Sequence, residues 1–305
     1  MKKKRSEFKG KRSDLIKRHI DSFPVLPATV VKLLAVVNDP DSSADDVIHT
    51  ILPDQSLCLT ILKIANSVLF GRPKKADSLK AAVVILGFNE VRRIAVTKAL
   101  INSFGKLPDK EKPFMDRFWT HAFLCGLAAV IIARDLKIDD DSAFMGGLLH
   151  DIGKLIMLQT FADDYTLGHW RYSSEEVLQE ELRTYSFTHD AVGGQLLEKW
   201  LFPQNLITAV AFHHRPDRAI VEQGFAHIVQ LADIMSFECC GESSLEGVDI
   251  VKTTFDAVPD IREQWRDHGW TLEDEAIAGW FRRLAENRDE GNYLKESYGG
   301  LPGVG

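Results

Sequence analysis

The sequence predicts an all-α protein with two helical lobes. Apolar residues recur at intervals of three and four along most of the chain, which is the period of an amphipathic helix. Alternating apolar and polar runs are scarce, so the parallel-sheet folds that host most nucleotide enzymes are not favoured. The chain has 305 residues, which is too long for one small bundle and suits two domains of ordinary size.

Three short helices are predicted in the first lobe. The first follows Pro27 and ends at the turn of residues 38–40. The second carries an apolar stripe over residues 57–68, and the third runs over residues 79–86 and ends at Gly87. Short helices joined by tight turns indicate a compact N-terminal bundle.

A break in composition separates the two lobes. Residues 105–113 contain lysines, acidic residues and two prolines, and a long helical pattern begins near Phe118. We therefore expect four parts: a basic tail and lead-in helix over 1–19, an N-terminal lobe over 20–112, a second lobe over 113–240, and additional helices with a frayed tail over 241–305.

Charge and hydropathy limit the partners. The net charge of −7 gives no overall attraction to nucleic acid, and the basic segment Met1–Arg12 is interpreted as a solubilising end rather than a binding arm. The longest apolar run, Ala122–Ala133, is shorter than the roughly 18 residues of a membrane span. No secretory signal follows the basic segment. We expect a cytoplasmic location, no membrane association and no nucleic-acid partner.

The four cysteines are interpreted as structural thiols. Cys58 and Cys125 fall inside apolar helical patterns, and Cys239 and Cys240 are adjacent, where an ordinary disulfide would be strained.

Histidines in the second lobe fall on the apolar faces of successive predicted helices. His121 shares its face with Leu124 and Cys125, so its ring is expected in the interior. Taken alone, such a histidine would be read as a core residue. Several imidazoles together with carboxylates, however, bind borderline transition metals well.

The run His150-Asp151-Ile152-Gly153-Lys154 is the most specific feature of the sequence. A carboxylate has two oxygens and can bridge two cations, while the neighbouring imidazole gives one of them a nitrogen. Lys154 could meet a phosphate oxygen or pair with a surface acid, and the sequence leaves both roles open.

Four further residues complete the candidate set. His189 opens a helical pattern, where it could act merely as a cap. His213 and His214 end another helix, where partial negative charge favours cations, although both could simply hydrogen-bond to exposed carbonyls. Asp233 lies on a core face, where a carboxylate without a cation would be costly. The chain order favours metal binding, and the predicted ligands are His121, His150, Asp151, His189, His213, His214 and Asp233.

The order of these residues resembles the HD superfamily of metal-dependent phosphohydrolases. His121, His150, Asp151 and Asp233 match its ligand pattern. The remaining three histidines resemble the additional ligands of the binuclear HD-GYP phosphodiesterases. The resemblance implies up to two divalent ions, with iron or manganese favoured and nickel, cobalt or zinc also compatible with mixed imidazole and carboxylate ligation.

The N-terminal half resembles the HDOD domain, whose members are usually regarded as regulatory. The resemblance covers about residues 20–240. Its motifs are residues 23–28 (FPVLPA), 38–40 (NDP), 53–57 (PDQSL), 64–67 (IANS) with Phe70-Gly71, and 82–87 (AVVILG).

Three departures from these patterns affect the functional expectation. Arg215 and Pro216 follow the paired histidines, and no Gly-Tyr-Pro motif is present, so hydrolysis of cyclic di-GMP is not supported. Gln55 replaces a proline common in the N-terminal motif. Arg117 lies one turn before His121, where an acidic residue would support a third metal, so two ions are the expected maximum.

Three functions remain open on this basis. The first is a metal-binding regulatory module that contacts another protein and recognises a nucleotide or other phosphate-bearing signal. The second is a working phosphohydrolase or phosphodiesterase, in which Asp151 and Lys154 would be catalytic. The third is a metal-free scaffold in which the same histidines hydrogen-bond to one another and to Asp151.

Overall fold

The computed structural model describes most of the chain, and every regular element in the described residues is a helix. The described residues are 12, 14–23, 26–37, 39–66, 76–104, 112–161, 164–165, 175–240 and 249–289. The all-α prediction is therefore confirmed. Residues 1–11 of the basic segment, the Phe70-Gly71 motif, most of the expected break over 105–113 and residues 290–305 of the expected C-terminal tail lie outside these residues.

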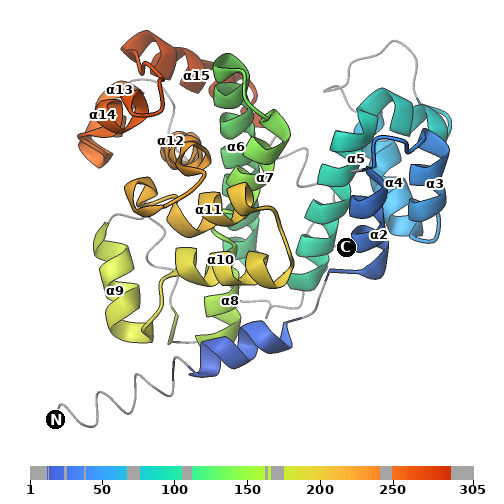
Figure 1. Cartoon of the computed structure of the whole chain (residues 1–305), viewed down its shortest axis with the longest axis horizontal. Helices are drawn as coiled ribbons and strands as arrows, with labels where there is room; N and C mark the ends of the chain where they lie inside the picture. Colours follow the sequence, from blue (N-terminus) through green and yellow to red (C-terminus); the bar gives the residue numbers. More distant parts are fainter. Residues whose placement is uncertain are drawn as a thin grey trace. The chain divides into compact units, whose positions relative to one another are not determined.

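The described residues form two compact units, one of residues 12–23 and 117–289 and one of residues 26–116 with the gaps given above. The smaller unit consists of α2 (Ala28–Val37), α3 (Ala44–Ile51), α4 (Gln55–Ala65) and α5 (Leu79–Phe104), which are marked in Figure 1. Ser43 and Asp46 form a reciprocal capping box at the start of α3, and Asp54 caps α4. Leu33, Ile51 and Ile61 lie on the apolar faces of these helices and are buried.

Gly87 interrupts the helical backbone, as predicted, but the chain continues in a second helical stretch. Gly87 has φ 77° and ψ 167°, a conformation that residues with a Cβ rarely adopt. The helix prediction for residues 79–86 is confirmed, whereas the helical stretch up to Phe104 was not predicted. That stretch is buried at most positions, and its mixed apolar and charged composition conceals the period.

Seven α-helices and one short 3-10 helix surround the candidate ligands in the larger unit, which contains α6 from Arg117 onward. They are α6 (Lys112–Leu136), α7 (Asp140–Leu149), α8 (Ile152–Phe161), α9 (Glu175–Tyr185), α10 (His189–Lys199), α11 (Gln204–Phe212), η5 (Pro216–Arg218) and α12 (Gln223–Cys239). The helix α6 begins six residues before the predicted start near Phe118. Pro113 falls in its first turn, where a proline is tolerated because the missing N–H would have no intrahelical partner.

Two glycines allow the ligand-bearing helices to approach closely. A Cβ on Gly153 would collide with the carbonyl oxygen of His189 and lie 2.7 Å from the backbone nitrogen of Gly193. A Cβ on Gly147 would lie 2.6 Å from the carbonyl oxygen of Cys125. The glycine of the His150–Lys154 run is therefore what brings α8 into backbone contact with α10.

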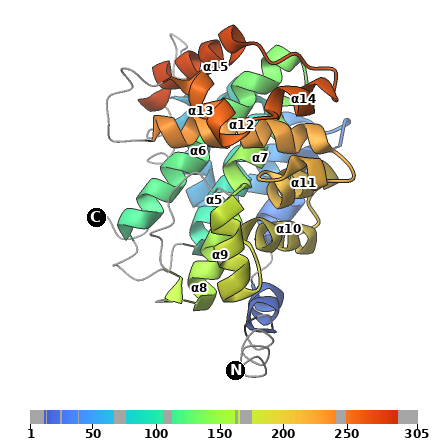
Figure 2. The ribbon, with the colours of Figure 1, turned by 90° about the vertical axis from the view of Figure 1, so that its left-hand side faces the viewer.

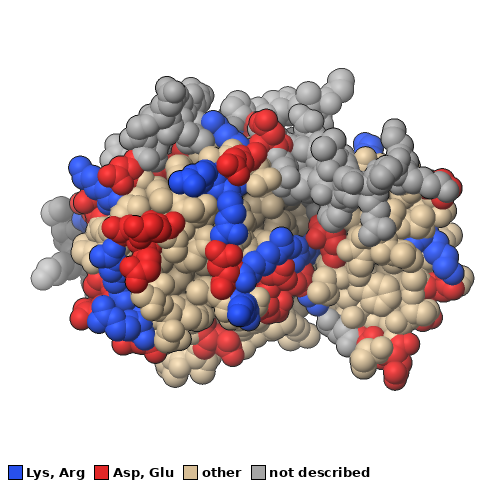
Figure 3. Space-filling model, turned by 90° about the horizontal axis from the view of Figure 1, so that it is seen from above, with Lys and Arg blue, Asp and Glu red and all other residues tan. Residues whose placement is uncertain are grey.

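The C-terminal helices α13 (Ile250–Ala257), α14 (Ile261–Arg266) and α15 (Asp274–Glu286) cover α12 and the end of α6 (Figure 2). Trp265 and Trp280 are buried in this layer, and Trp270 is half-buried. Basic and acidic side chains are interspersed on the described part of the face seen in Figure 3.

One stretch of α6 has the properties of a membrane-spanning helix. By length and composition alone, Phe114–Leu136 could cross a membrane: an 18-residue window within it has a mean hydropathy of 1.3, but 67% of that window is buried inside the structure. Burial of this kind is typical of a core helix, because a helix that is apolar on most sides can be covered by neighbouring helices instead of lipid.

Candidate metal centre

All seven predicted ligands come together in the larger unit. His121 comes from α6, His150 ends α7, Asp151 joins α7 to α8, His189 opens α10, His213 and His214 follow α11, and Asp233 lies on α12. Six of them are buried and His214 is half-buried. The helical faces predicted from the sequence therefore converge on one point of the fold.

The ligand atoms lie close together in overlapping combinations, one of which joins His150, His213 and Asp233, and the contacts of Asp151 divide them into two groups that share this residue. The first group contains His121, His150, Asp151 and Asp233, and the second contains Asp151, His189, His213 and His214. Oδ2 of Asp151 faces the first group, at 3.4 Å from His150 Nε2 and 3.9 Å from His121 Nε2. Oδ1 faces the second, at 3.3 Å from His189 Nε2 and 3.8 Å from His213 Nε2.

These spacings suit ligands arranged around an ion. Ligand atoms about 2.1 Å from an ion lie roughly 3.0–3.4 Å apart along the edges of an octahedron or tetrahedron. In the first group, His121 Nε2 lies 3.1 Å and His150 Nε2 lies 3.5 Å from Asp233 Oδ1. In the second, the Nε2 atoms of His189 and His214 are 2.9 Å apart. Both groups therefore have dimensions that are compatible with metal ligation.

Four of the five imidazoles are oriented by a hydrogen bond at Nδ1. The Nδ1 atoms of His150 and His213 donate to the carbonyl oxygens of Gly147 and Val210, at 2.7 and 2.8 Å. A carbonyl oxygen only accepts, so the proton of each neutral ring is at Nδ1 and Nε2 carries a lone pair. This is the arrangement found in metal-ligating histidines.

His189 and His121 are held in the same way by side chains that the sequence reasoning missed. His189 Nδ1 donates to Glu181 Oε2 at 2.8 Å, and His121 Nδ1 lies 3.2 Å from Ser236 Oγ. Ser236 Oγ donates its own proton to the carbonyl oxygen of Asp233, so it accepts from His121. All four rings therefore direct Nε2 toward the two groups, and on each neutral ring this atom carries the lone pair.

Of these two missed residues, Glu181 is the charged one, and it is buried. It accepts from the backbone nitrogen of His189 and from the hydroxyl of Tyr165, both at 2.8 Å, as well as from His189 Nδ1. The sequence feature that could have identified Glu181 is its position on the apolar face of α9, where Val177 and Tyr185 are also buried. A carboxylate on such a face needs a polar partner.

Two buried atoms at the centre lack a hydrogen-bond partner among the described residues. They are Asp151 Oδ1 and His213 Nε2, which both belong to the second group. Leaving a buried polar atom unsatisfied costs about 1–3 kcal/mol. A cation between them would satisfy both atoms, so the donor set fits a divalent metal.

The electrostatics keep the carboxylates ionised. Burial alone would raise the pKa of Asp151, but Lys154 and His150 hold the pKa of this carboxyl well below its usual range. Burial opposes protonation of His189, yet the Glu181 carboxylate raises the pKa of that imidazole to about 9. Burial and the nearby His150 lower the pKa of His213 to about 4, which favours the neutral ring that a metal needs.

Lys154 corrects one expectation. It is buried, and its Nζ lies 2.6 Å from Asp151 Oδ2, so its acidic partner is the shared carboxylate at the centre and not a surface acid. Arg117, by contrast, is exposed.

Comparison with known proteins agrees with this architecture. An HDOD domain protein of unknown function from Geobacter sulfurreducens is 23% identical, with a TM-score of 0.69 over 93% of this chain and 98% of that one. A Shewanella amazonensis SB2B protein, provisionally named a phosphohydrolase, is 21% identical, with a TM-score of 0.68 over the same shares. A Marinobacter aquaeolei VT8 protein, provisionally named a signal transduction protein, is 18% identical, with a TM-score of 0.64 over 95% of this chain and 66% of that one. These likenesses show the fold.

The sequence comparisons identify the family. An uncharacterised protein of Treponema pallidum (strain Nichols) is 24% identical over 200 residues, which are 64% of this chain. The matched segment spans only 38% of that curated relative. The HDOD domain pattern matches residues 23–216, which is more than half of the chain. The chain therefore belongs to the HDOD domain family.

Proposed function

We propose that this protein is a regulatory HDOD protein of signal transduction whose larger unit binds up to two divalent metal ions and recognises a phosphate-bearing ligand there. The observation that carries the proposal is the position of Asp151, whose two oxygens face two separate groups of imidazoles. One carboxylate between two such groups is suited to bridging two cations.

The donor set limits the choice of metal. Five imidazoles and two carboxylates suit iron, manganese, nickel, cobalt or zinc, and we favour iron or manganese because of the resemblance to the HD superfamily. A divalent ion in such a site supplies Lewis-acid attraction for a phosphoryl oxygen. The chain's own contribution is to hold the imidazoles in place through Gly147, Val210, Glu181 and Ser236 and to bury the centre.

A regulatory role is favoured over catalysis by the surroundings of Asp151. Lys154 is held by Asp151 Oδ2 at 2.6 Å, so its ammonium is already engaged in neutralising the shared carboxylate. The sequence also lacks the Gly-Tyr-Pro motif after His214. We further propose that the partner is another protein and that the protein acts in the cytoplasm. The regulatory role is supported by the Marinobacter protein of similar fold, which is named as a signal transduction protein.

Turnover is the second candidate function, because the ligand set is complete. In that case Asp151 would hold the ions, and Lys154 would offset negative charge that develops on a phosphoryl group. The test is a panel of phosphomonoesters, phosphodiesters and nucleotides, offered to protein of verified metal content. Ordinary enzymatic rates that vanish in Asp151→Asn would overturn the regulatory proposal in favour of a hydrolase.

Binding is tested with inorganic phosphate as the probe. Calorimetric titration of the manganese-loaded protein should show binding of phosphate, and the same titration of chelator-treated protein should show none. Equal phosphate binding with and without metal would show that phosphate binds independently of the metal centre, and this would contradict the proposal. Phosphate binding to neither form, at concentrations up to the millimolar range, would remove the phosphate-bearing ligand.

A further inference from the structure

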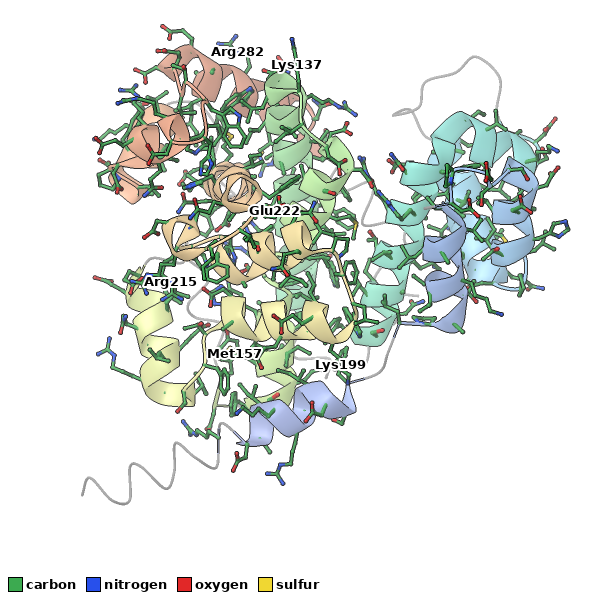
Figure 4. All side chains as sticks on the ribbon, viewed as in Figure 1. Lys137, Met157, Lys199, Arg215, Glu222 and Arg282 are labelled. Atoms are coloured by element: carbon green, nitrogen blue, oxygen red, sulfur yellow. The ribbon has the colours of Figure 1, made fainter. Side chains whose placement is uncertain are left out.

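One ion pair joins the two segments that carry the histidines of the second group. Asp190 directly follows His189, and Arg215 directly follows His214. Asp190 Oδ2 accepts from Arg215 Nη2 at 3.1 Å. The two ligand-bearing segments are thus connected one residue away from the ligands themselves. In Figure 4, Arg215 is labelled where the chain leaves α11.

The carboxylate of this pair is fixed by burial and by its own helix. Asp190 has no exposed side-chain surface, and its Oδ1 accepts from the backbone nitrogen of Ala191 at 2.7 Å, at the start of α10. The Arg215 side chain is 23% exposed and reaches inward to Oδ2. A buried carboxylate without a cation nearby is energetically costly, so the Asp190 carboxylate favours the inward position of the Arg215 side chain.

The pair constrains the second group and not the first. Adjacent Cα atoms are about 3.8 Å apart, so fixing Asp190 against Arg215 also limits the separation of His189 and His214. Their Nε2 atoms are 2.9 Å apart, which is a ligand-to-ligand spacing. The residues of the first group that are not shared come from α6, from the end of α7 and from α12, and the ion pair joins none of these elements.

We infer that Asp190 and Arg215 are positioning residues that set the affinity of the second group for its ion, while the first group binds its ion independently of them. The inference rests on the proposed metal-binding function and adds to it a residue pair that controls the second ion. Arg215 acts through His214, and Asp190 through His189, without contact between the pair and the metal.

The test measures the two ion-binding steps separately. Wild-type protein and Arg215→Met are stripped with chelator and titrated with manganese in competition with a fluorescent chelator, and metal content is measured after dialysis. Arg215→Met should keep one ion per chain at wild-type affinity, whereas the affinity for the other should fall about 10- to 100-fold, as for other residues that support ligands. Arg215→Lys, which keeps the charge, should recover most of that loss.

A double-variant comparison separates positioning from general damage. If the two residues act through their ion pair, Asp190→Asn combined with Arg215→Met should weaken the second ion no more than either change alone. The matched control is Arg134→Met, which makes the same substitution in the exposed Arg134–Asp140 pair of the same unit and should change neither ion.

Each outcome has a definite meaning. Loss confined to one ion, recovery by lysine and non-additivity support the inference. Equal weakening of both ions, unchanged binding in Arg215→Met, or a wild-type chain that holds a single ion overturns the inference but leaves metal binding intact. A folded wild-type chain that binds no ion overturns the proposed function and this inference together.

Discussion

Removing the charge of Glu181 tests whether a carboxylate behind a histidine tunes the second group. In Glu181→Gln the side chain keeps its length, and its amide oxygen can still accept from the nitrogens of His189, which now lie 2.8 Å from Glu181 Oε2. The amide nitrogen would face the hydroxyl of Tyr165, which can accept a hydrogen bond instead of donating one. The change therefore removes charge with little change in shape.

The expected magnitude follows from the hydrogen bonds. A bond to a charged group contributes about 1.5–3 kcal/mol and a neutral one about 0.5–1.5 kcal/mol, so the His189 ring loses roughly 1–1.5 kcal/mol of support. Because about 1.4 kcal/mol corresponds to a factor of ten, the second ion should bind about tenfold more weakly. This is the lower end of the range for residues that support metal ligands.

The assay is a manganese titration in competition with a fluorescent chelator, with circular dichroism to verify the helical content. Glu176→Gln is the matched control, because Glu176 lies on the same helix and is exposed. Unchanged affinity for both ions in Glu181→Gln would refute the reasoning, and so would an equal loss in Glu176→Gln.

Three further changes test the centre, the packing and the pH dependence. Asp151→Asn should abolish the manganese-induced rise in Tm, which for a ligand at 100 times its Kd reflects about 2.7 kcal/mol; a rise equal to the wild type's would contradict the shared carboxylate. Gly153→Ala should destabilise the fold by about 3 kcal/mol in urea unfolding, because its Cβ meets the backbone of His189, whereas Gly279→Ala, in open space on α15, should be neutral or stabilising. Burial and the adjacent His268 lower the pKa of His227 to about 4, so its neutral form adds stability that is complete above about pH 6.5 and is lost toward pH 4. Between pH 7 and pH 5, the free energy of unfolding should therefore fall by about 2 kcal/mol less in His227→Asn than in the wild type. An identical pH dependence of the two proteins would show that His227 is protonated in the fold at pH 5.

The sequence was sufficient to predict which residues converge, but not how they divide into groups. His121 and Asp233 could be placed inside because each shares a helical face with apolar neighbours. The two directions of the Asp151 oxygens depend on the approach of α8 to α10, which Gly153 permits. That approach is a tertiary contact, and no local pattern encodes its geometry.

Residues that support the ligands were harder to find than the ligands. Glu181 appears in the sequence as one acid among several on α9, and its role emerges only when Tyr165 and His189 meet it. The partnership of Asp190 with Arg215 depends on the packing of two helix ends against each other. The role of Lys154 stayed open between a phosphate oxygen and a surface acid, because its chain neighbours do not reveal that it lies in the interior.

The central claim is that the seven converging residues bind divalent metal through the shared carboxylate of Asp151. The most direct measurement is elemental analysis of wild-type and Asp151→Asn protein, both purified without a nickel column, reconstituted with manganese or iron and freed of excess metal. The account predicts one to two ions per wild-type chain and a large loss of both in the variant. A folded wild-type chain without stoichiometric first-row metal, or a variant that retains the wild-type content, would contradict it.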